Sequence, residues 1–151
     1  MSDTGRQVLS RPVNPAGIHP PFGNYSHGVL LEDVQRILVA SGQLGISRDR
    51  EIPPDVAAQA EICFESADAI LFEAGLDRSC VARIAGFLTH REHMGAYMAV
   101  RDRWIAGLPF PPASTLVIVR GFTRPEFKVE VEITACQTGR LAERQLPLPK
   151  T

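Results

Sequence analysis

The chain has 151 residues, a formal net charge of −1, and a composition that is 44% hydrophobic and 22% charged. A chain of this length forms one domain that can bury a sizeable core without disulfides or a metal. Its near-neutral charge lacks the basic footprint of a nucleic-acid-binding protein, and no apolar run approaches the ~20 residues of a membrane span. We therefore expect one soluble domain with no nucleic-acid or membrane partner.

The N-terminal segment and the cysteines indicate the compartment. Residues 1–11 are polar and lack the apolar core of a signal peptide. Cys63, Cys80 and Cys136 are far apart and form no C-x-x-C pair, which argues against a disulfide framework or a zinc site. We expect buried thiols in a reducing, cytoplasmic environment, and no cofactor.

The first predicted elements are a strand at 37–41 and a long helix at 55–74. Asp55 is a typical N-cap for this helix, and Gly75 is a typical residue just past its end. Apolar residues recur along it at spacings of three and four, which places them on one stripe. They are Val56, Ala60, Cys63, Phe64, Ala67, Ile70, Leu71 and Ala74.

A strand at 81–88 is followed by a second helix. The sequence Thr89-His90-Arg91-Glu92 fits a capping box at its start, and Gly107, shortly before Pro109, marks its predicted end. Five side chains are expected on its buried side. They are Met94, Tyr97, Met98, Trp104 and Ile105.

The last predicted element is a pair of strands joined through residues 121–126. In the second of them, 127–134, apolar residues alternate with Lys128, Glu130, Glu132 and Thr134, so one face is apolar and the other polar. The order of elements predicts an α+β fold, a mixed sheet with both helices on one face.

The domain is expected to span residues 13–138. A flexible N-terminal segment, 1–12, and a C-terminal tail, 139–151, are predicted on either side of it.

The run Leu116-Val117-Ile118-Val119 indicates oligomerisation. It is apolar on both strand faces, which is typical of a strand buried on both sides. Two helices cover only one face of the sheet, so a second copy of the chain is the simplest cover for the other. A monomer with an unusually apolar solvent face is the alternative.

Several segments occur in a distinctive order and spacing across about residues 14–137. They are Tyr25 near Gly28, Ser41-Gly42-Gln43, Pro54 to Ala60, Ala74-Gly75-Leu76, and Lys128 to Ile133. Together they resemble the Rid family (YjgF, reactive intermediate deaminase A). The resemblance implies a chorismate-mutase-like fold and a homotrimer with three pockets between neighbouring subunits. It also implies hydrolysis of reactive enamines and imines, with release of ammonia.

One departure from the family pattern concerns the substrate. Archetypal Rid deaminases carry an arginine in a Pro-Ala-Arg-Ser segment, where its guanidinium clamps the substrate carboxylate. Here the stretch reads Pro111-Pro112-Ala113-Ser114-Thr115, and Ala113 occupies the arginine's place. A simple 2-imino acid is therefore not the expected substrate. Arg120 lies an odd number of residues from Ala113, so in a regular strand it points to the opposite face, unless the strand bulges.

The resemblance also suggests roles for site residues. Imine hydrolysis needs a positioned water and donors for the developing charge. Glu130 is the candidate that positions the water, and the Tyr25 hydroxyl is the candidate that bonds substrate or water. The candidate substrate-binding residues are Ser41, Gly42, Ser114, Thr115 and Arg120. The structural alternatives are a solvated glutamate, a packed aromatic, an ordinary turn and strand-edge packing.

The four histidines form no recognised metal spacing and no triad order with a serine. His90 and His93 are expected at the exposed start of the second helix. His27 lies two residues from Tyr25, where a titratable ring is placed to serve as an acid or base, although we do not expect it to be essential.

Two functions remain open from the sequence. The first is a Rid-like enamine or imine deaminase, or a related hydrolase, that acts on a small reactive metabolite. The alternative is a non-catalytic small-ligand-binding or regulatory trimer that keeps the pocket without the chemistry. RNA cleavage, an activity attributed to some relatives, is disfavoured by the neutral charge and the lack of a basic, aromatic-rich face.

Overall fold

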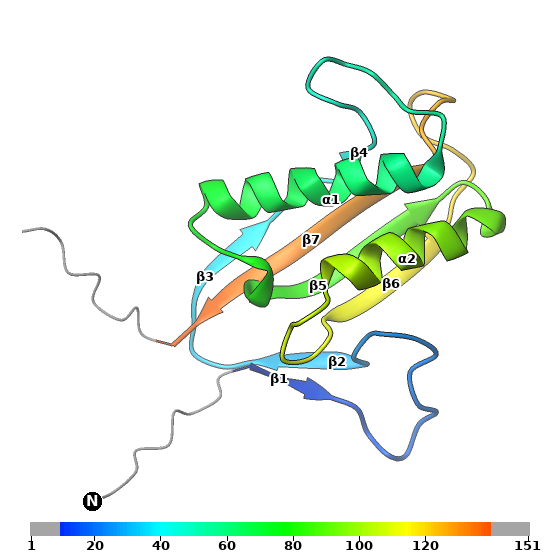
Figure 1. Cartoon of the computed structure of the whole chain (residues 1–151). Helices are drawn as coiled ribbons and strands as arrows, with labels where there is room; N and C mark the ends of the chain where they lie inside the picture. The colour runs from blue at the N-terminus through cyan, green and yellow to red at the C-terminus, as the bar shows by residue number, and fades with distance from the viewer. Residues whose placement is uncertain (1–9, 140–151) are drawn as a thin grey trace, which may run out of the picture.

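The computed structural model describes residues 10–139, and its framework is a five-stranded mixed sheet (Figure 1). The strands run in the order β3-β7-β5-β6, and the short β4 also pairs with β7. β5 and β6 are parallel, whereas β7 is antiparallel to β3, β4 and β5. The strands are β3 (Val34–Val39), β4 (Gln43–Leu44), β5 (Val81–Leu88), β6 (Ala113–Ile118) and β7 (Val129–Thr138).

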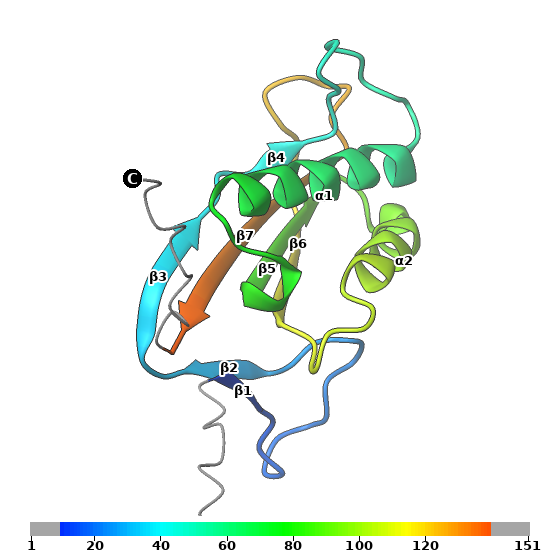
Figure 2. The same ribbon diagram turned by 60° about the vertical axis from the view of Figure 1, so that its left-hand side comes forward.

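Both helices, α1 (Val56–Glu73) and α2 (Met94–Trp104), lie on one face of this sheet, as Figures 1 and 2 show. The predicted α+β fold is therefore confirmed. The predicted terminal strands do not pair with each other, because β5 lies between β6 and β7.

Helix α1 begins and ends where its sequence signals predict. The Asp55 carboxylate accepts a hydrogen bond from the Ala58 N–H at 2.9 Å, and Gly75 adopts a φ of +69°, which favours glycine. Gln59 is also buried on this helix. Its amide donates to the Pro53 and Glu126 carbonyls and accepts from the Lys128 N–H, which ties α1 to the start of β7.

The predicted capping box at the second helix is wrong. A 3-10 turn, η2 (Arg91–His93), precedes α2, and no side chain caps either start. The Thr89 hydroxyl lies 3.0 Å from the His90 ring nitrogen instead. Because the extra turn moves Met94 to the first position of α2, its side chain is 50% exposed rather than buried.

The remainder of the predicted buried side of α2 fits the packing. Tyr97, Trp104 and Ile105 are buried and Met98 is partly buried, but Val100 and Arg101 are buried as well. Arg101 is only 2% exposed, and its guanidinium donates to the Asp102 carboxylate and to the Ser114 hydroxyl.

Several short elements were not predicted from the sequence. These are the two-stranded sheet of β1 (Ser10–Val13) and β2 (Gly28–Leu31), the turn η1 (Arg78–Cys80), and β4. β1 begins before the expected domain boundary at residue 13, while most of the two expected flexible segments lies outside the described residues. Elements of two to four residues are too short to display a period.

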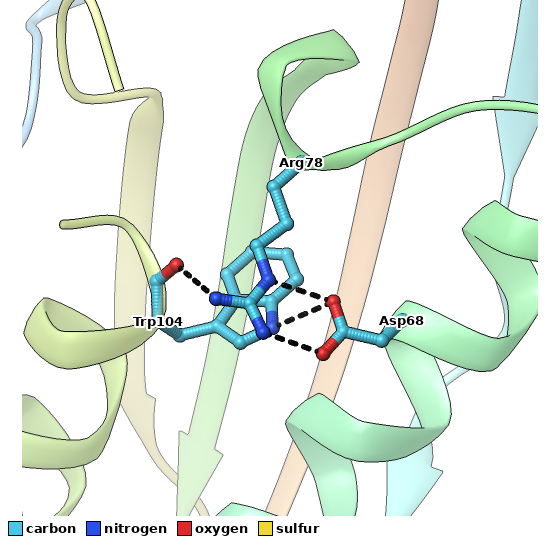
Figure 3. A network of polar contacts seen from close by, with 3 residues as sticks. All are labelled: Asp68, Arg78 and Trp104. Atoms are coloured by element: carbon cyan, nitrogen blue, oxygen red, sulfur yellow. Dashed lines mark hydrogen bonds and ion pairs between the residues drawn. The ribbon is translucent and has the colours of Figure 1, made fainter. Parts of the chain in front are cut away.

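Asp68, Arg78 and Trp104 form a polar cluster that fixes the helix layer at one end (Figure 3). The Arg78 guanidinium donates to both Asp68 oxygens at 2.8 and 2.7 Å, and to the Trp104 carbonyl at 3.0 Å. The Trp104 indole donates to Asp68 at 3.0 Å and lies beneath the guanidinium. The hydrogen bonds that Arg78 donates to Asp68 raise the pKa of Arg78. The cluster joins α1, α2 and η1.

Candidate functional site

The strand registers sort side chains onto two faces of the sheet. Residues paired across neighbouring strands share a face. Ile84, Leu88, Val129, Val131 and Ile133 are buried beneath the helices. The opposite face, called the open face below, is not covered by either helix. Three rows of side chains cross it: Val117, Phe87 and Glu130; Thr115, Ala85 and Glu132; Ala113, Arg83 and Thr134.

Glu130 forms the centre of the candidate site. It lies at one end of the open face, paired in register with Leu44 of β4 and Phe87 of β5. Its carboxylate packs directly against Gly42, where any added Cβ would overlap a carboxylate oxygen. The side chain opens onto a hollow of about 450 Å³. The hollow is lined by Leu44, Gly121, Phe122, Thr123 and Glu130.

The surroundings of Glu130 make it a stronger base. Burial raises the pKa of its carboxyl, and the nearby negative charge of Glu132 raises that pKa further. A carboxylate whose pKa moves towards neutrality accepts a proton more readily at neutral pH. The structure therefore brings a partly desolvated carboxylate, a glycine backbone and a hollow together at one place.

The predicted substrate-binding residues are only partly brought together. Gly42 adjoins Glu130 and Ser41 precedes it in the chain, while Thr115 lies on the open face in the row next to that of Glu130. Ser114 lies on the helix-covered face, where its hydroxyl accepts from Arg101 at 3.2 Å. Arg120 lies beyond the end of β6 and is exposed, so strand alternation does not determine its direction.

Tyr25 lies at the other end of β6. The neighbouring Ser26 forms a bridge with Ala113, and its hydroxyl donates to the Pro111 carbonyl at 2.6 Å. The Tyr25 hydroxyl accepts from the Phe22 N–H at 3.1 Å, and its ring stands edge-on to His27. Four residue steps separate the row of Ala113 from the row of Glu130, roughly 13 Å along a strand. One chain by itself does not bring Tyr25 to Glu130.

Arg83 and Glu132 are open-face residues that the sequence analysis missed as site candidates. Their nearest charged atoms lie 3.9 Å apart, and their side chains are 47% and 41% exposed. Arg83 is the one basic residue within strands β5, β6 and β7. A signal was present in the sequence, because a lone arginine inside an apolar strand must point away from the core.

The histidines and cysteines form no metal-holding group in the described part of the chain. No group of three or more His, Cys, Asp or Glu residues between positions 10 and 139 is arranged to hold a metal. His93 is half-buried, and burial lowers its pKa, with a further contribution from His90. Burial raises the pKa of Cys63 to about 12, which favours the protonated thiol at neutral pH.

Similarity to known proteins agrees with this fold. A family model described as Endoribonuclease L-PSP matches residues 17–137. Protein DfrA of Myxococcus xanthus is 34% identical over 132 residues, which cover 86% of this chain and 98% of that protein. The 2-iminobutanoate/2-iminopropanoate deaminase of Escherichia coli K12 is 25% identical over 130 residues, covering 84% and 98% respectively.

A solved structure of a Rid-family protein shares this fold. The crystal structure of YyfB from Yersinia pestis, described as a protein of unknown function of the conserved Rid family, superposes with a TM-score of 0.76 at 26% identity. The match covers 85% of this chain and 99% of that one. No helix among residues 10–139 is long and apolar enough to cross a bilayer. On the family model, the sequence relatives and the shared fold, the chain belongs to the Rid (YjgF) family.

Proposed function

We propose that this protein is an imine or enamine hydrolase of the Rid type that acts on a small reactive metabolite. The observation that carries the proposal is the Glu130 carboxylate, partly desolvated and packed against Gly42 at the edge of a hollow. The E. coli relative that is named a 2-iminobutanoate/2-iminopropanoate deaminase supports this reaction class.

The proposed reaction needs only a water and a base. Glu130 takes a proton from the water as the oxygen adds to the imine carbon, and the proton is then delivered to the nitrogen. The resulting carbinolamine loses ammonia and leaves a carbonyl compound. The raised pKa of Glu130 suits both steps, because one group must accept a proton and then release it.

The proposed working unit is a homotrimer with pockets between subunits. Ile37 and Val39 are 65% and 75% exposed on β3, and Val117 is also exposed on the open face. Exposed apolar side chains gathered on one sheet face favour contact with another copy. Because Tyr25 and Glu130 lie apart within one chain, a neighbouring copy would have to supply Tyr25 to complete the pocket.

The substrate is proposed to differ from a simple 2-imino acid. Strand β6 carries no charged residue, and its open-face positions are Ala113, Thr115 and Val117. A carboxylate clamp from β6, as in the archetypal deaminases, is therefore missing. RNA cleavage, which the family description names, finds less support, because Arg83 is the one cation on strands β5 to β7.

Two measurements test the proposal. Light scattering at micromolar concentration should give the mass of a trimer, and a panel of imines generated in situ should yield at least one substrate that releases ammonia faster with protein than without it. A stable monomer would contradict the inter-subunit pocket. A trimer that binds small carbonyl compounds but accelerates no imine would support the alternative of a non-catalytic ligand-binding protein.

A further inference from the structure

The open face contains a cation beside the position where the clamping arginine is missing. Arg83 of β5 is paired in register with Ala113 of β6 and with Thr134 of β7. Since paired residues share a face, the Arg83 side chain leaves the sheet on the same side as Glu130 and next to Ala113.

The donors of Arg83 are free of hydrogen bonds, whereas those of two other arginines close to the sheet, Arg78 and Arg101, are occupied. Each guanidinium nitrogen of Arg78 donates to Asp68 or Trp104, and Arg101 is buried with Asp102 and Ser114. Arg83 makes only a 3.9 Å ion pair with Glu132, which is longer than a hydrogen bond. Among residues 10–139 no hydrogen bond occupies its guanidinium, and the side chain is 47% exposed.

We propose that Arg83 binds the anionic group of the substrate, in place of the arginine that β6 lacks. This assignment rests on the proposed function, and it names the substrate class as small imines or enamines, other than the simple 2-imino acids, that carry a carboxylate or a comparable anion. Arg83 is thus a specificity-determining residue that reaches the pocket from β5.

The spacing on the open face suits such a substrate. The row of Arg83 lies four residue steps from the row of Glu130, roughly 13 Å along a strand, and the ion pair with Glu132 directs the guanidinium towards the Glu130 side. An anion bonded to Arg83 and a water bonded to Glu130, each at about 2.8 Å, leave space between them for a short carbon chain. The guanidinium has five donors, so it can keep its contact with Glu132 and still offer two parallel N–H groups to a carboxylate.

The first test measures ligand binding without requiring turnover. Purified full-length wild-type protein and Arg83→Met are titrated by NMR with 2-oxobutanoate, 3-oxobutanoate and 4-oxopentanoate, and with the neutral butan-2-one. Wild type should bind at least one oxo acid, and Arg83→Met should weaken that binding about ten- to a hundredfold, the range for charge-assisted hydrogen bonds. Binding of butan-2-one should stay within about twofold.

Matched variants separate this role from a general loss of charge. Arg83→Lys keeps the charge but loses the planar fork, so it should recover only part of the affinity. Arg103→Met also removes an ion-paired arginine, because Arg103 is the exposed partner of Glu61. This variant should leave the affinity for oxo acids unchanged. Arg120→Met distinguishes Arg83 from the other arginine near β6. A loss of oxo-acid binding in Arg120→Met but not in Arg83→Met would overturn the assignment.

The second test uses turnover. For an imine substrate that carries a carboxylate, Arg83→Met should raise KM by the same ten- to hundredfold, with a smaller change in kcat, and should spare an imine without an anionic group. Equal losses on both imines, or no binding of any oxo acid by wild type at millimolar concentration, would refute the role of Arg83. Oxo-acid binding that depends on Arg83, without ammonia release from any imine, would refute the proposed hydrolase and leave Arg83 as an anion-binding residue.

Discussion

The two faces of the five-stranded sheet differ in what their side chains do. On β7, Val129, Val131 and Ile133 lie on the face beneath the helices and are at most 2% exposed. On the same strand, Glu130 and Glu132 project from the open face and are half-buried. A strand with a period of two thus contributes to the core with one set of residues and to a candidate site with the other.

The comparison shows why stability and chemistry are separable in this protein. The helix-covered face packs apolar side chains against the two helices, whose buried Phe64, Tyr97 and Trp104 rings contact one another. The open face combines carboxylates, one arginine and exposed apolar side chains. Substitutions on the first face should therefore act on folding, and substitutions on the second should act on turnover or assembly.

The largest expected effect is on turnover, from Glu130→Gln. This change keeps the size and one hydrogen-bonding oxygen but removes the base, a role worth about 10²–10⁴-fold in rate. The rate of ammonia release from the best imine of the panel measures it. Glu132→Gln is the matched control on the same face and should cost far less. Full activity of Glu130→Gln in an intact trimer would disprove the role of Glu130 as the base.

A large effect on folding is expected from the helix-covered face. Ile84→Ala removes a fully buried side chain, and it should lower the free energy of unfolding by about 2–5 kcal/mol. Urea unfolding followed by circular dichroism measures the change. Val39→Ala, at a 75% exposed position, should cost less than about 1 kcal/mol in the dissociated chain and should instead weaken assembly. Similar unfolding costs for both variants would remove the distinction between the faces.

A smaller effect on turnover is expected from Gly42→Ala. The added Cβ would overlap the Glu130 carboxylate and the adjoining Cγ, so the Glu130 side chain must swing away from Gly42, and its three side-chain torsions allow this without a backbone shift. A displacement of about 1 Å from the productive position costs up to about a hundredfold in rate. We expect a ten- to hundredfold loss of turnover with a nearly unchanged melting temperature. A large fall in melting temperature would show that the overlap strains the backbone instead.

The smallest expected effect is the pH dependence of stability at Glu130. Burial, with Glu132, raises the folded-state pKa of this carboxyl above its unfolded value. Its contribution to stability is therefore present below the unfolded pKa and is lost as the pH rises through the folded pKa. Glu130→Gln should match wild type near pH 3.5 and become slightly more stable at pH 7, within about 0.5 kcal/mol because the group is half exposed. Melting curves across this range measure the difference, and the opposite trend would contradict the raised pKa.

Local patterns in the sequence predicted much of the fold. The stripe of α1, its Asp55 cap and its Gly75 stop involve residues within a few positions of one another, so their spacing is visible in the chain. The same holds for the alternation in β7 and for the bounds of β5. The start of α2 was mispredicted because a 3-10 turn there competes with the capping box and differs from it by only a few hydrogen bonds.

The sequence by itself determined the fold class, the two helices, the polar face of β7 and the resemblance to the Rid family. Only the tertiary structure decided which of those polar residues meet. It placed Gly42 against Glu130 across 88 positions of sequence, put Ser114 on the face away from Glu130, and set Arg83 beside Ala113. These neighbours depend on strand order and register, which arise from contacts between distant segments and leave no period in the sequence to read.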